Sequence, residues 1–432
     1  MQRRLRAQDK GYCLMHNSDL ALLYKEKDHQ EIPLHDDTVT VIMVTYNKHK
    51  YIRELILSFE HLNYKRELLD IVVIDNASAD GSEEKLRAEF GDAITVIQTG
   101  ANLGGAGGFN TGMRYAIEKL DNDYIWLLDN DVVVHPNSLN WLMDTIKNNP
   151  NAAAAGSMIL QLDKPELISE IGAFMDWGKA RVDMQNAGEN FTEITDDLLQ
   201  ERKVEYCAAA SLLKTRKSIT KLGYWDDLFI HFDDVDWCLR APKQGMAIYC
   251  NPRSIVFHES LQCKQATWIK YYNIRNLLYL YKEHKLIALP LVFAKFFAWS
   301  IYLTLHGYFK NAGLGFKAIW DFMLGKKAQQ DFPLEKYQPL MNKDWSESKD
   351  RLYVFSNQAN LDRFLEISGA KITEGSEVLL YSNGLLKTAL GQLMNLFTNK
   401  EIIMDGDFES SFFFPCFRKK VVVYPGYGTM VA

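Results

Sequence analysis

The sequence predicts an α/β fold in which a mostly parallel sheet is flanked by helices. From Thr38 onward, short apolar runs alternate with stretches of helical composition, which is the pattern of strand–helix–strand units. Polar, acidic or glycine-rich segments follow several of the apolar runs. Ligands bind at the carboxyl ends of parallel strands, so these segments are the places to look for a site.

The elements of the main sheet are expected in a regular order. The run 39–44 is rich in β-branched residues and predicts the first strand, and a helix over about 49–61 follows. The next expected elements are a strand at 69–74, a helix at 81–90, a strand at 94–97, a helix at 109–120 and a strand at 124–128. Residues 151–260 predict mixed helices and strands with longer loops.

The remaining sequence predicts separate regions on either side of this domain. An aromatic and basic helix is expected over 268–283. In the tail, the predicted elements again alternate between strands and helices. The strands are expected at 352–355, 378–381, 402–404 and 421–424, and the helices at 359–368 and 385–397. The expected organisation is an N-terminal extension at 1–37, the α/β domain at 38–265, a helical region at 266–327, a linker at 328–350 and a small α/β region at 351–432.

One apolar run, at 288–309, is about long enough to span a bilayer. Pro290, Lys295 and His306 interrupt it, and a charge inside a span is costly. Lysines border the run on both sides. We therefore favour a helix that lies on a membrane surface over a true span, with a core or oligomer-contact helix as the alternative.

Charge and cysteine content argue against several classes of binding site. The 432-residue chain has a net charge of −6, which disfavours a broad nucleic-acid surface. Its six cysteines are scattered without a C-x-x-C pair, so neither a zinc site nor a disulfide framework is expected. The basic N-terminus lacks an apolar segment typical of a signal peptide, and a cytoplasmic location is the default expectation.

The most informative motif is Asp129-Asn130-Asp131, directly after the strand expected at 124–128. Side chains two apart in a strand point to the same side, so both carboxylates face one ligand. Paired acids suit a hard divalent cation that shares a diphosphate, with Asp131 as the stronger ligand. Asp129 is expected to bind either the metal or a ribose.

Two strand-end segments and a glycine-rich segment precede the acid pair. Residues 44–47 follow the first strand, and residues 75–82 follow the second, with Asp75 favoured as a nucleobase or ribose ligand. Residues 102–110 contain four glycines in five positions, which lets main-chain N–H groups approach a phosphate or sugar. The segment matches neither a P-loop nor a dinucleotide fingerprint.

A second acidic cluster follows at Asp233-Asp234-Val235-Asp236. Crowding raises a carboxylate's pKa and suits it to general-base work. Arg240 lies about one helical turn beyond Asp236 and is positioned to pair with it. His258 ends an apolar strand downstream, a placement that suits it to complete the metal's ligands.

Together these motifs resemble inverting glycosyltransferases of family 2, which have the GT-A fold, in the branch of bacterial rhamnosyltransferases and galactofuranosyltransferases. The resemblance covers roughly residues 38–325, and it includes the segment Tyr271–Asn276. Asn130 stands where many members carry Asp, but the outer acids are intact. The resemblance does not extend to the tail from about 345.

The resemblance implies a role for each motif. It implies Mn²⁺ or Mg²⁺ held by Asp129, Asp131 and His258, with Asp234 as the base that deprotonates the acceptor hydroxyl. Acceptor binding is expected from Asp233, Asp236 and Trp225. The residues expected to hold the nucleotide-sugar donor are Thr45, Tyr46, Asp75, Asn102, Gly104, Gly105, Gly107, Gly108, Asn110 and Asp129.

The implied reaction is a single in-line displacement with inversion, from dTDP-rhamnose or UDP-galactofuranose to a saccharide or lipid-linked saccharide, in bacterial cell-surface polysaccharide synthesis. Peripheral contact with the inner face of the cell membrane and a homo-oligomer are further expectations. The alternatives are a nucleotidyltransferase, which also uses a metal at paired acids, and a nucleotide-binding protein with an inactive site. Neither needs a base cluster such as the one around Asp234.

Overall fold

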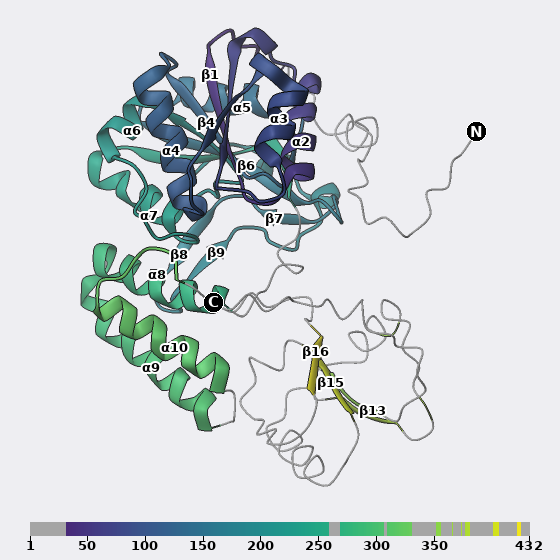
Figure 1. Cartoon of the computed structure of the whole chain (residues 1–432), viewed down its shortest axis with the longest axis vertical. Helices are drawn as coiled ribbons and strands as arrows, with labels where there is room; N and C mark the ends of the chain where they lie inside the picture. The colour runs from purple at the N-terminus through teal and green to yellow at the C-terminus, as the bar shows by residue number, and fades with distance from the viewer. Residues whose placement is uncertain are drawn as a thin grey trace.

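The computed structural model describes residues 32–258, 268–305 and 309–330, together with 351–355, 365, 373, 376–380, 401–405 and 421–424 (Figure 1). A large sheet with helices on both faces occupies 32–258, and three helices follow it. This arrangement confirms the predicted α/β fold class.

The large sheet has the strand order β10-β12-β6-β11-β4-β1-β2-β3, with β5 paired to β12 and β7 paired to β6. Its N-terminal half is parallel, because β4, β1, β2 and β3 run in one direction. Beyond β4 the sheet is mixed, since β11 is antiparallel to both β4 and β6 while β6 and β12 are parallel. The bounds are β1 (Val39–Thr45), β2 (Leu69–Asp75), β3 (Thr95–Gln98), β4 (Tyr124–Leu128), β5 (Val132–Val134), β6 (Ala152–Gln161), β7 (Ile168–Glu170), β10 (Arg202–Val204), β11 (Ser211–Thr215) and β12 (Ala247–His258).

Alternate residues of the strands contribute side chains to two apolar cores, one on each face of the sheet. On β1, for example, Val41 faces one core and Ile42 faces the other. Helices α2 (His49–Ser58), α3 (Ser82–Phe90) and α5 (Ser138–Asn148) cover the first core, and α4 (Gly104–Lys119), α6 (Arg216–Leu222) and α7 (Asp233–Arg240) cover the second. A small hairpin of β8 (Ala173–Asp176) and β9 (Arg181–Met184) lies beside the sheet.

The helix predicted at 109–120 begins five residues earlier, at Gly104, so most of the glycine-rich segment is helical. Close packing explains the difference. A Cβ atom added at Gly108 would lie 2.5 Å from a methyl group of Val44, and one added at Gly112 would lie 2.3 Å from a methyl group of Ile42. These glycines let α4 lie directly on β1, and the burial outweighs their poor helix propensity.

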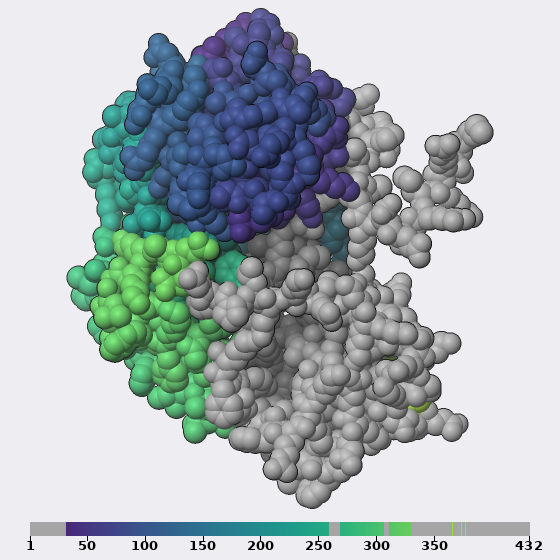
Figure 2. All heavy atoms as spheres, viewed as in Figure 1, coloured from purple at the N-terminus to yellow at the C-terminus, as the bar shows by residue number. Residues whose placement is uncertain are grey.

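Three helices follow the sheet: α8 (Ile269–His284), α9 (Leu289–Leu305) and α10 (Phe309–Met323). Helices α9 and α10 pack on each other and on α8, and α8 joins the core beneath α7. The predicted helix at 268–283 therefore matches α8. In Figure 2 this helical segment, in green, forms a distinct part of the surface below the sheet-bearing body.

The four strands predicted in the tail are confirmed as a parallel sheet of order β14-β13-β15-β16. Their bounds are β13 (Arg351–Phe355), β14 (Glu377–Leu380), β15 (Glu401–Asp405) and β16 (Val421–Tyr424). Apart from residue 365, the helices predicted at 359–368 and 385–397 lie outside the described residues, as do most of the N-terminal extension and the linker.

Candidate functional site

The carboxyl ends of β1, β2 and β4 meet at one edge of the sheet. Thr45 of β1 is opposite Asp75 of β2, and the Asn130 amide after β4 donates to the carbonyl of Val44 at 2.7 Å. The main-chain N–H of Asn76 donates to the carbonyl of Thr45 at 2.9 Å. The three predicted strand-end motifs are thus neighbours, as a parallel sheet requires.

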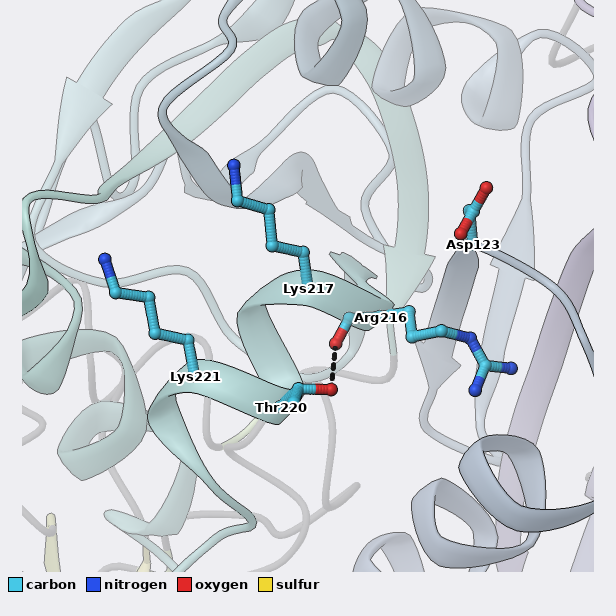
Figure 3. A pocket seen from close by; sticks show the side chains of 5 residues that line it. All are labelled: Asp123, Arg216, Lys217, Thr220 and Lys221. Carbon is cyan, nitrogen blue, oxygen red and sulfur yellow. Dashed lines mark hydrogen bonds between the residues drawn. The ribbon is translucent and has the colours of Figure 1, made fainter.

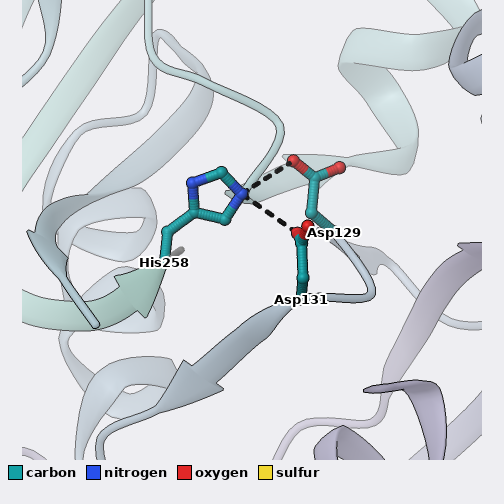
Figure 4. A group of neighbouring side chains, drawn as sticks. All are labelled: Asp129, Asp131 and His258. Carbon is teal, nitrogen blue, oxygen red and sulfur yellow. Dashed lines mark hydrogen bonds and ion pairs between the residues drawn. The ribbon is translucent and has the colours of Figure 1, made fainter. Parts of the chain in front are cut away.

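Asp129, Asp131 and His258 come together at this edge (Figure 4). Strand β5 starts directly after Asp131 and pairs antiparallel with β12, so that His258 is opposite Val132. His258 Nε2 lies 3.0 Å from Asp131 Oδ1 and 3.8 Å from Asp129 Oδ2. The predicted trio is therefore assembled by strand pairing across 127 residues of sequence.

The donor atoms of the trio fit a divalent cation. One ligand atom from each residue lies within 4.8 Å of the other two. Two carboxylate oxygens and one imidazole nitrogen suit Mn²⁺, and Mg²⁺ accepts the same carboxylates with added waters. Within the described part of the chain, this trio is the one group of such residues close enough to hold a metal ion.

Lys48 is a site residue that the sequence analysis missed. Its ammonium Nζ lies 3.2 Å from Asp131 Oδ2, and its side chain is about one third exposed. It follows the strand-end segment 44–47 directly, and this proximity to a strand end is the signal that was available in the sequence. A cation beside the acid pair suits a site for a diphosphate, whose charge exceeds that of one metal ion.

Asp75 is fully buried and already has partners for both oxygens. Oδ1 accepts from the main-chain N–H of Ser78 at 2.9 Å, and Oδ2 accepts from the Gln98 amide at 2.9 Å. Its carboxylate therefore shapes the turn after β2. Beside it, Tyr46 is 43% exposed, whereas Thr45 is buried and its hydroxyl has no hydrogen-bond partner among the described residues.

The glycine-rich segment is held by packing. Asn102 Oδ1 accepts from the N–H of Gly104 at 3.0 Å, ahead of α4. Gly104 has a φ of +69°, and an added Cβ there would lie 2.0 Å from the carbonyl oxygen of Phe229. Gly107 packs on Leu103 in the same way. Gly105 is different, because an added Cβ there would face Asp233 Oδ2 at 3.9 Å. Gly105 therefore lies beside the acidic cluster.

Asn110 and Trp225 are joined to each other. The side-chain amide of Asn110 donates to the main-chain carbonyl of Trp225 at 3.0 Å. Its oxygen accepts from the main-chain N–H of Trp225 at 2.9 Å. The Trp225 indole is 5% exposed and packs against Phe109 at a ring-centroid distance of 5.1 Å. Trp225 thus lies beneath the surface, and its indole N–H has no hydrogen-bond partner among the described residues.

The acidic cluster forms the first turn of α7, where carboxylates are favoured by the helix dipole. Asp234 accepts three hydrogen bonds: from the Tyr206 hydroxyl at 3.1 Å, and from the N–H groups of Ala209 at 3.2 Å and Val235 at 2.8 Å. Tyr206 was not identified from the sequence, because it lies 28 residues away in an unrelated segment.

Burial and mutual repulsion set the charge state of these acids. Burial, and then the neighbouring Asp234 carboxylate, raise the pKa of Asp233 well above its usual range. Burial also raises the pKa of Asp234, although its three hydrogen bonds oppose the effect. Glu170 of β7, which accepts from the N–H of Ala208 at 3.3 Å, has its pKa raised to about 7 by burial. Burial therefore favours the protonated form of three neighbouring acids, which is the kind of pKa shift found at proton-transfer sites.

The side chain of Asp236 points away from Asp233 and Asp234 and pairs with other residues. Its Oδ2 lies 3.2 Å from Nε of Arg240, which confirms the predicted pair, and its Oδ1 lies 2.7 Å from Nε2 of His284 on α8. The His284 and Asp236 side chains are almost fully buried. Asp236 thus joins α7 to α8, a function that the sequence analysis did not foresee because His284 is 48 residues distant.

A hollow of about 570 Å³ lies at the opposite end of β4 (Figure 3). Its lining residues are Asp123, Arg216, Lys217, Thr220 and Lys221. Asp123 immediately precedes β4, whereas Asp129 follows it, so the hollow is remote from the acid pair. Arg216 donates to four carbonyls around the end of α4, including those of Ala116 and Leu120, and serves as a helix cap.

Comparison with known proteins agrees with this geometry. The family model described as Glycosyl transferase family 2 matches residues 40–200. The chain contains a family 2 glycosyltransferase domain. This agrees with the resemblance stated from the motifs, and the matched residues include the acid pair of the glycosyltransferase domain.

Curated relatives extend the match beyond residue 200. The galactofuranosyltransferase GlfT2 of Mycobacterium tuberculosis is 26% identical over 239 residues, which cover 50% of this chain and 37% of GlfT2. The N-acetylglucosaminyl-diphospho-decaprenol L-rhamnosyltransferase of the same species is 24% identical, covering 52% of this chain and 77% of the relative. The dTDP-rhamnosyl transferase RfbF of Shigella flexneri is also 24% identical. The glycosyltransferase domain thus spans about a third of the two GlfT2 relatives.

Solved structures show a weaker likeness to the glycosyltransferase domain. GalNAc-T7 with UDP, GalNAc and Mn²⁺ has a TM-score of 0.43 at 19% identity, covering 52% of this chain and 43% of that one. The mannosyltransferase PcManGT of Pyrobaculum calidifontis, in complex with GDP-Man and Mn²⁺, has a TM-score of 0.42 at 18% identity, covering 71% of this chain and 81% of that one.

Proposed function

We propose that this protein is a metal-dependent inverting glycosyltransferase that moves rhamnose or galactofuranose from a nucleotide sugar to a saccharide or lipid-linked saccharide in bacterial cell-surface polysaccharide synthesis. The observation that carries the proposal is the trio of Asp129, Asp131 and His258 at the carboxyl edge of the sheet in a family 2 glycosyltransferase domain. The rhamnosyl and galactofuranosyl transferases among its relatives support the choice of sugar, with dTDP-rhamnose and UDP-galactofuranose as donors.

In the proposed mechanism, Asp234 accepts the proton of the acceptor hydroxyl as its oxygen attacks the anomeric carbon from the face opposite the leaving group. The nucleoside diphosphate departs, and the configuration inverts. Asp129, Asp131 and His258 would hold Mn²⁺ or Mg²⁺, which supplies Lewis-acid stabilisation of the diphosphate charge when bound. Lys48, beside Asp131, is placed to add a second positive charge there.

A donor screen tests this function. Purified protein with Mn²⁺ is given a panel of nucleotide sugars, and release of the nucleoside diphosphate is followed with and without saccharide acceptors. Release that depends on one donor and rises with acceptor supports the proposal. Nucleotide binding without turnover of any donor supports the inactive-site alternative, and release of pyrophosphate from a nucleoside triphosphate supports a nucleotidyltransferase.

Replacing Tyr206 by Phe gives a prediction about pH. The Tyr206 hydroxyl bond lowers the pKa of Asp234, so its loss raises that pKa further. A base works when deprotonated, so the acid limb of the kcat/KM profile is expected to move to higher pH. Four other titratable groups interact electrostatically with Asp234: Asp233, Glu170, Lys214 and Cys238.

The measurement is the pH dependence of kcat/KM for wild type and Tyr206→Phe. Tyr281→Phe is the matched control, because its hydroxyl is buried and binds the carbonyl of Trp177, away from Asp234. A Tyr206→Phe profile that coincides with that of wild type, or that moves toward lower pH, would contradict the assignment of Asp234 as the base.

The α9–α10 region is the proposed contact with a membrane. Within the described residues, Leu286–Leu305 is long and apolar enough to cross a bilayer, and 22% of its most apolar stretch is buried. Ile287 is 95% exposed and Leu291 is 74% exposed. Lys295, which interrupts the run, donates from Nζ to the carbonyl of Lys179 beside β9, so its charge is directed back toward the sheet-bearing body. These features favour an interfacial helix.

Flotation with anionic liposomes tests this contact. The double variant Ile287→Ser, Leu291→Ser is expected to float at least about tenfold less than wild type, because it removes two exposed apolar side chains from the proposed interface. The matched control is Leu34→Ser, Phe174→Ser, which removes two exposed apolar side chains elsewhere. Absence of wild-type flotation, or equal loss in both double variants, would rule against a membrane role for the α9–α10 region.

A further inference from the structure

The chain that leads into the acidic cluster has an unusual backbone. Phe229, His231 and Phe232 have φ values of 69°, 64° and 66°, the left-handed region that side chains other than glycine rarely adopt. Such a backbone persists only when its surroundings hold it in place, and it is concentrated at functional sites. Phe232 immediately precedes Asp233, so this strained segment, residues 228–232, sets the position of both Asp233 and Asp234.

Helix α8 holds the strained segment through two adjacent side chains. The Asn276 amide lies within hydrogen-bond distance of three carbonyls, those of Ile230 at 2.7 Å, His231 at 3.0 Å and Leu228 at 3.1 Å. The Arg275 guanidinium donates to the carbonyl of Leu228 at 2.9 Å. Both side chains are fully buried, so no water replaces these donors without a rearrangement.

The other side of the strained segment contacts the start of α4. The N–H of Ala106 donates to the carbonyl of Phe229 at 3.2 Å, and Gly104 leaves room for that carbonyl. The segment is therefore fixed between α4, which begins near the nucleotide-binding edge, and α8. The N–H of Asp236 then donates to the carbonyl of Phe232 at 2.9 Å as α7 begins.

We infer that Arg275 and Asn276 are positioning residues that hold Asp233 and Asp234 in place for proton transfer, an inference that rests on the proposed function. The segment Tyr271–Asn276 was noted in the sequence without a role. Its last two residues have no hydrogen bond to the acid pair or to His258 in the described structure; their bonds are to the strained segment, to each other, to Tyr271 and to Ala328.

Arg275 also joins the acidic cluster to the end of the helical region. Its Nη1 donates to the carbonyl of Ala328 at 2.9 Å, while its Nη2 holds Leu228. Lys327, the neighbour of Ala328, pairs with Asp226, just before the strained segment. The chain that leaves α10 and the chain that enters α7 therefore share one buried guanidinium.

The experiment compares Asn276→Ala with Asn273→Ala. Asn273 lies one turn earlier on α8, is half-buried, and has no hydrogen bond to residues 228–232. Asn276→Ala is expected to lower kcat by about 10- to 100-fold, the scale of a small misplacement of a catalytic group. Binding of UDP or dTDP with Mn²⁺ is expected to stay within about twofold of wild type, because the residues proposed to bind the nucleotide and the metal lie at the edge of the sheet. Asn273→Ala is expected to leave both unchanged.

Hydrogen exchange supplies a readout that is independent of turnover. Main-chain exchange of residues 229–236 is expected to be at least about tenfold faster in Asn276→Ala than in wild type or Asn273→Ala. Unchanged kcat and unchanged exchange would overturn the inference, and so would a loss of nucleotide affinity as large as the loss of kcat. If wild type transfers no sugar, the proposed function fails, and slower or unchanged exchange in Asn276→Ala would then overturn the positioning role by itself.

Asn276→Ser provides the test if Asn276→Ala does not fold. Its hydroxyl keeps one donor, so loss of kcat and gain of exchange are both expected to be smaller than for full removal but larger than for Asn273→Ser. Equal behaviour of Asn276→Ser and Asn273→Ser would overturn the inference.

Discussion

Replacing Asp234 by Asn is expected to lower sugar transfer by at least about 10²-fold, the usual scale for removing a general base. The amide has nearly the shape of the carboxylate but cannot take up the acceptor's proton. Binding of the nucleoside diphosphate is expected to persist, because Asp234 lies on α7 and the proposed nucleotide site lies at the ends of β1, β2 and β4. Single-turnover transfer and nucleotide titration measure the two effects separately.

Asp233→Asn tests whether Asp233, and not Asp234, is the general base. The Asp233 carboxylate faces Gly105 and experiences the charge of Asp129, whereas both oxygens of Asp234 already accept protein hydrogen bonds. Should Asp233→Asn lose transfer while Asp234→Asn turns over normally, the role of base passes to Asp233. Asp236→Asn serves as the third arm, and there the expected loss is in folding stability, because its partners are Arg240 and His284.

Replacing His258 by Ala is expected to weaken Mn²⁺ binding by at least about tenfold and to reduce transfer in parallel. His258 supplies the nitrogen of the trio, and its removal leaves two carboxylates beside Lys48. A chelator should abolish wild-type transfer, and Mn²⁺ or Mg²⁺ should restore it. Calorimetric titration with Mn²⁺ measures the affinity directly.

His284→Ala is the matched control for this prediction, since His284 also contacts a carboxylate but lies away from the trio. Its Mn²⁺ affinity is expected to equal that of wild type. Full transfer in the presence of chelator, or full transfer by His258→Ala, would refute the assignment of Asp129, Asp131 and His258 as metal ligands.

The parts of the site that local sequence could predict are those at strand ends. Residues 124–128 predict a strand, and the acids after it lie where a parallel sheet gathers ligands, so the pattern alone was enough to place Asp129 and Asp131 at the candidate site. His258 was found because it ends an apolar strand, although its contact with Asp131 depends on the pairing of β5 with β12.

The parts that local sequence could not predict depend on distant contacts. Tyr206, between β10 and β11, and His284 of α8 contact the acidic cluster only in the folded chain, and neither has a distinctive neighbourhood in the sequence. The helix was expected to begin at residue 109, within the glycine-rich segment, yet contact with β1 and Phe229 makes most of that segment the start of α4. Trp225 was expected to line the acceptor site, but it packs beneath the surface on Phe109.

Asp131 and His258 are 127 residues apart in the sequence, which limits how far the protein can be truncated without losing the trio. Strand β12 supplies His258 and pairs with β6, so the candidate metal site is completed by the strand of the large sheet that comes last in the sequence. A fragment that ends at residue 200, the limit of the family match, retains the acid pair but lacks both β12 and α7. Strand β11 is missing as well, so β6 loses its partners β11 and β12 on both sides and its connection to β4, which invites association with other chains. A fragment that keeps the trio therefore has to extend at least through β12, and during synthesis the trio assembles only after that strand has emerged.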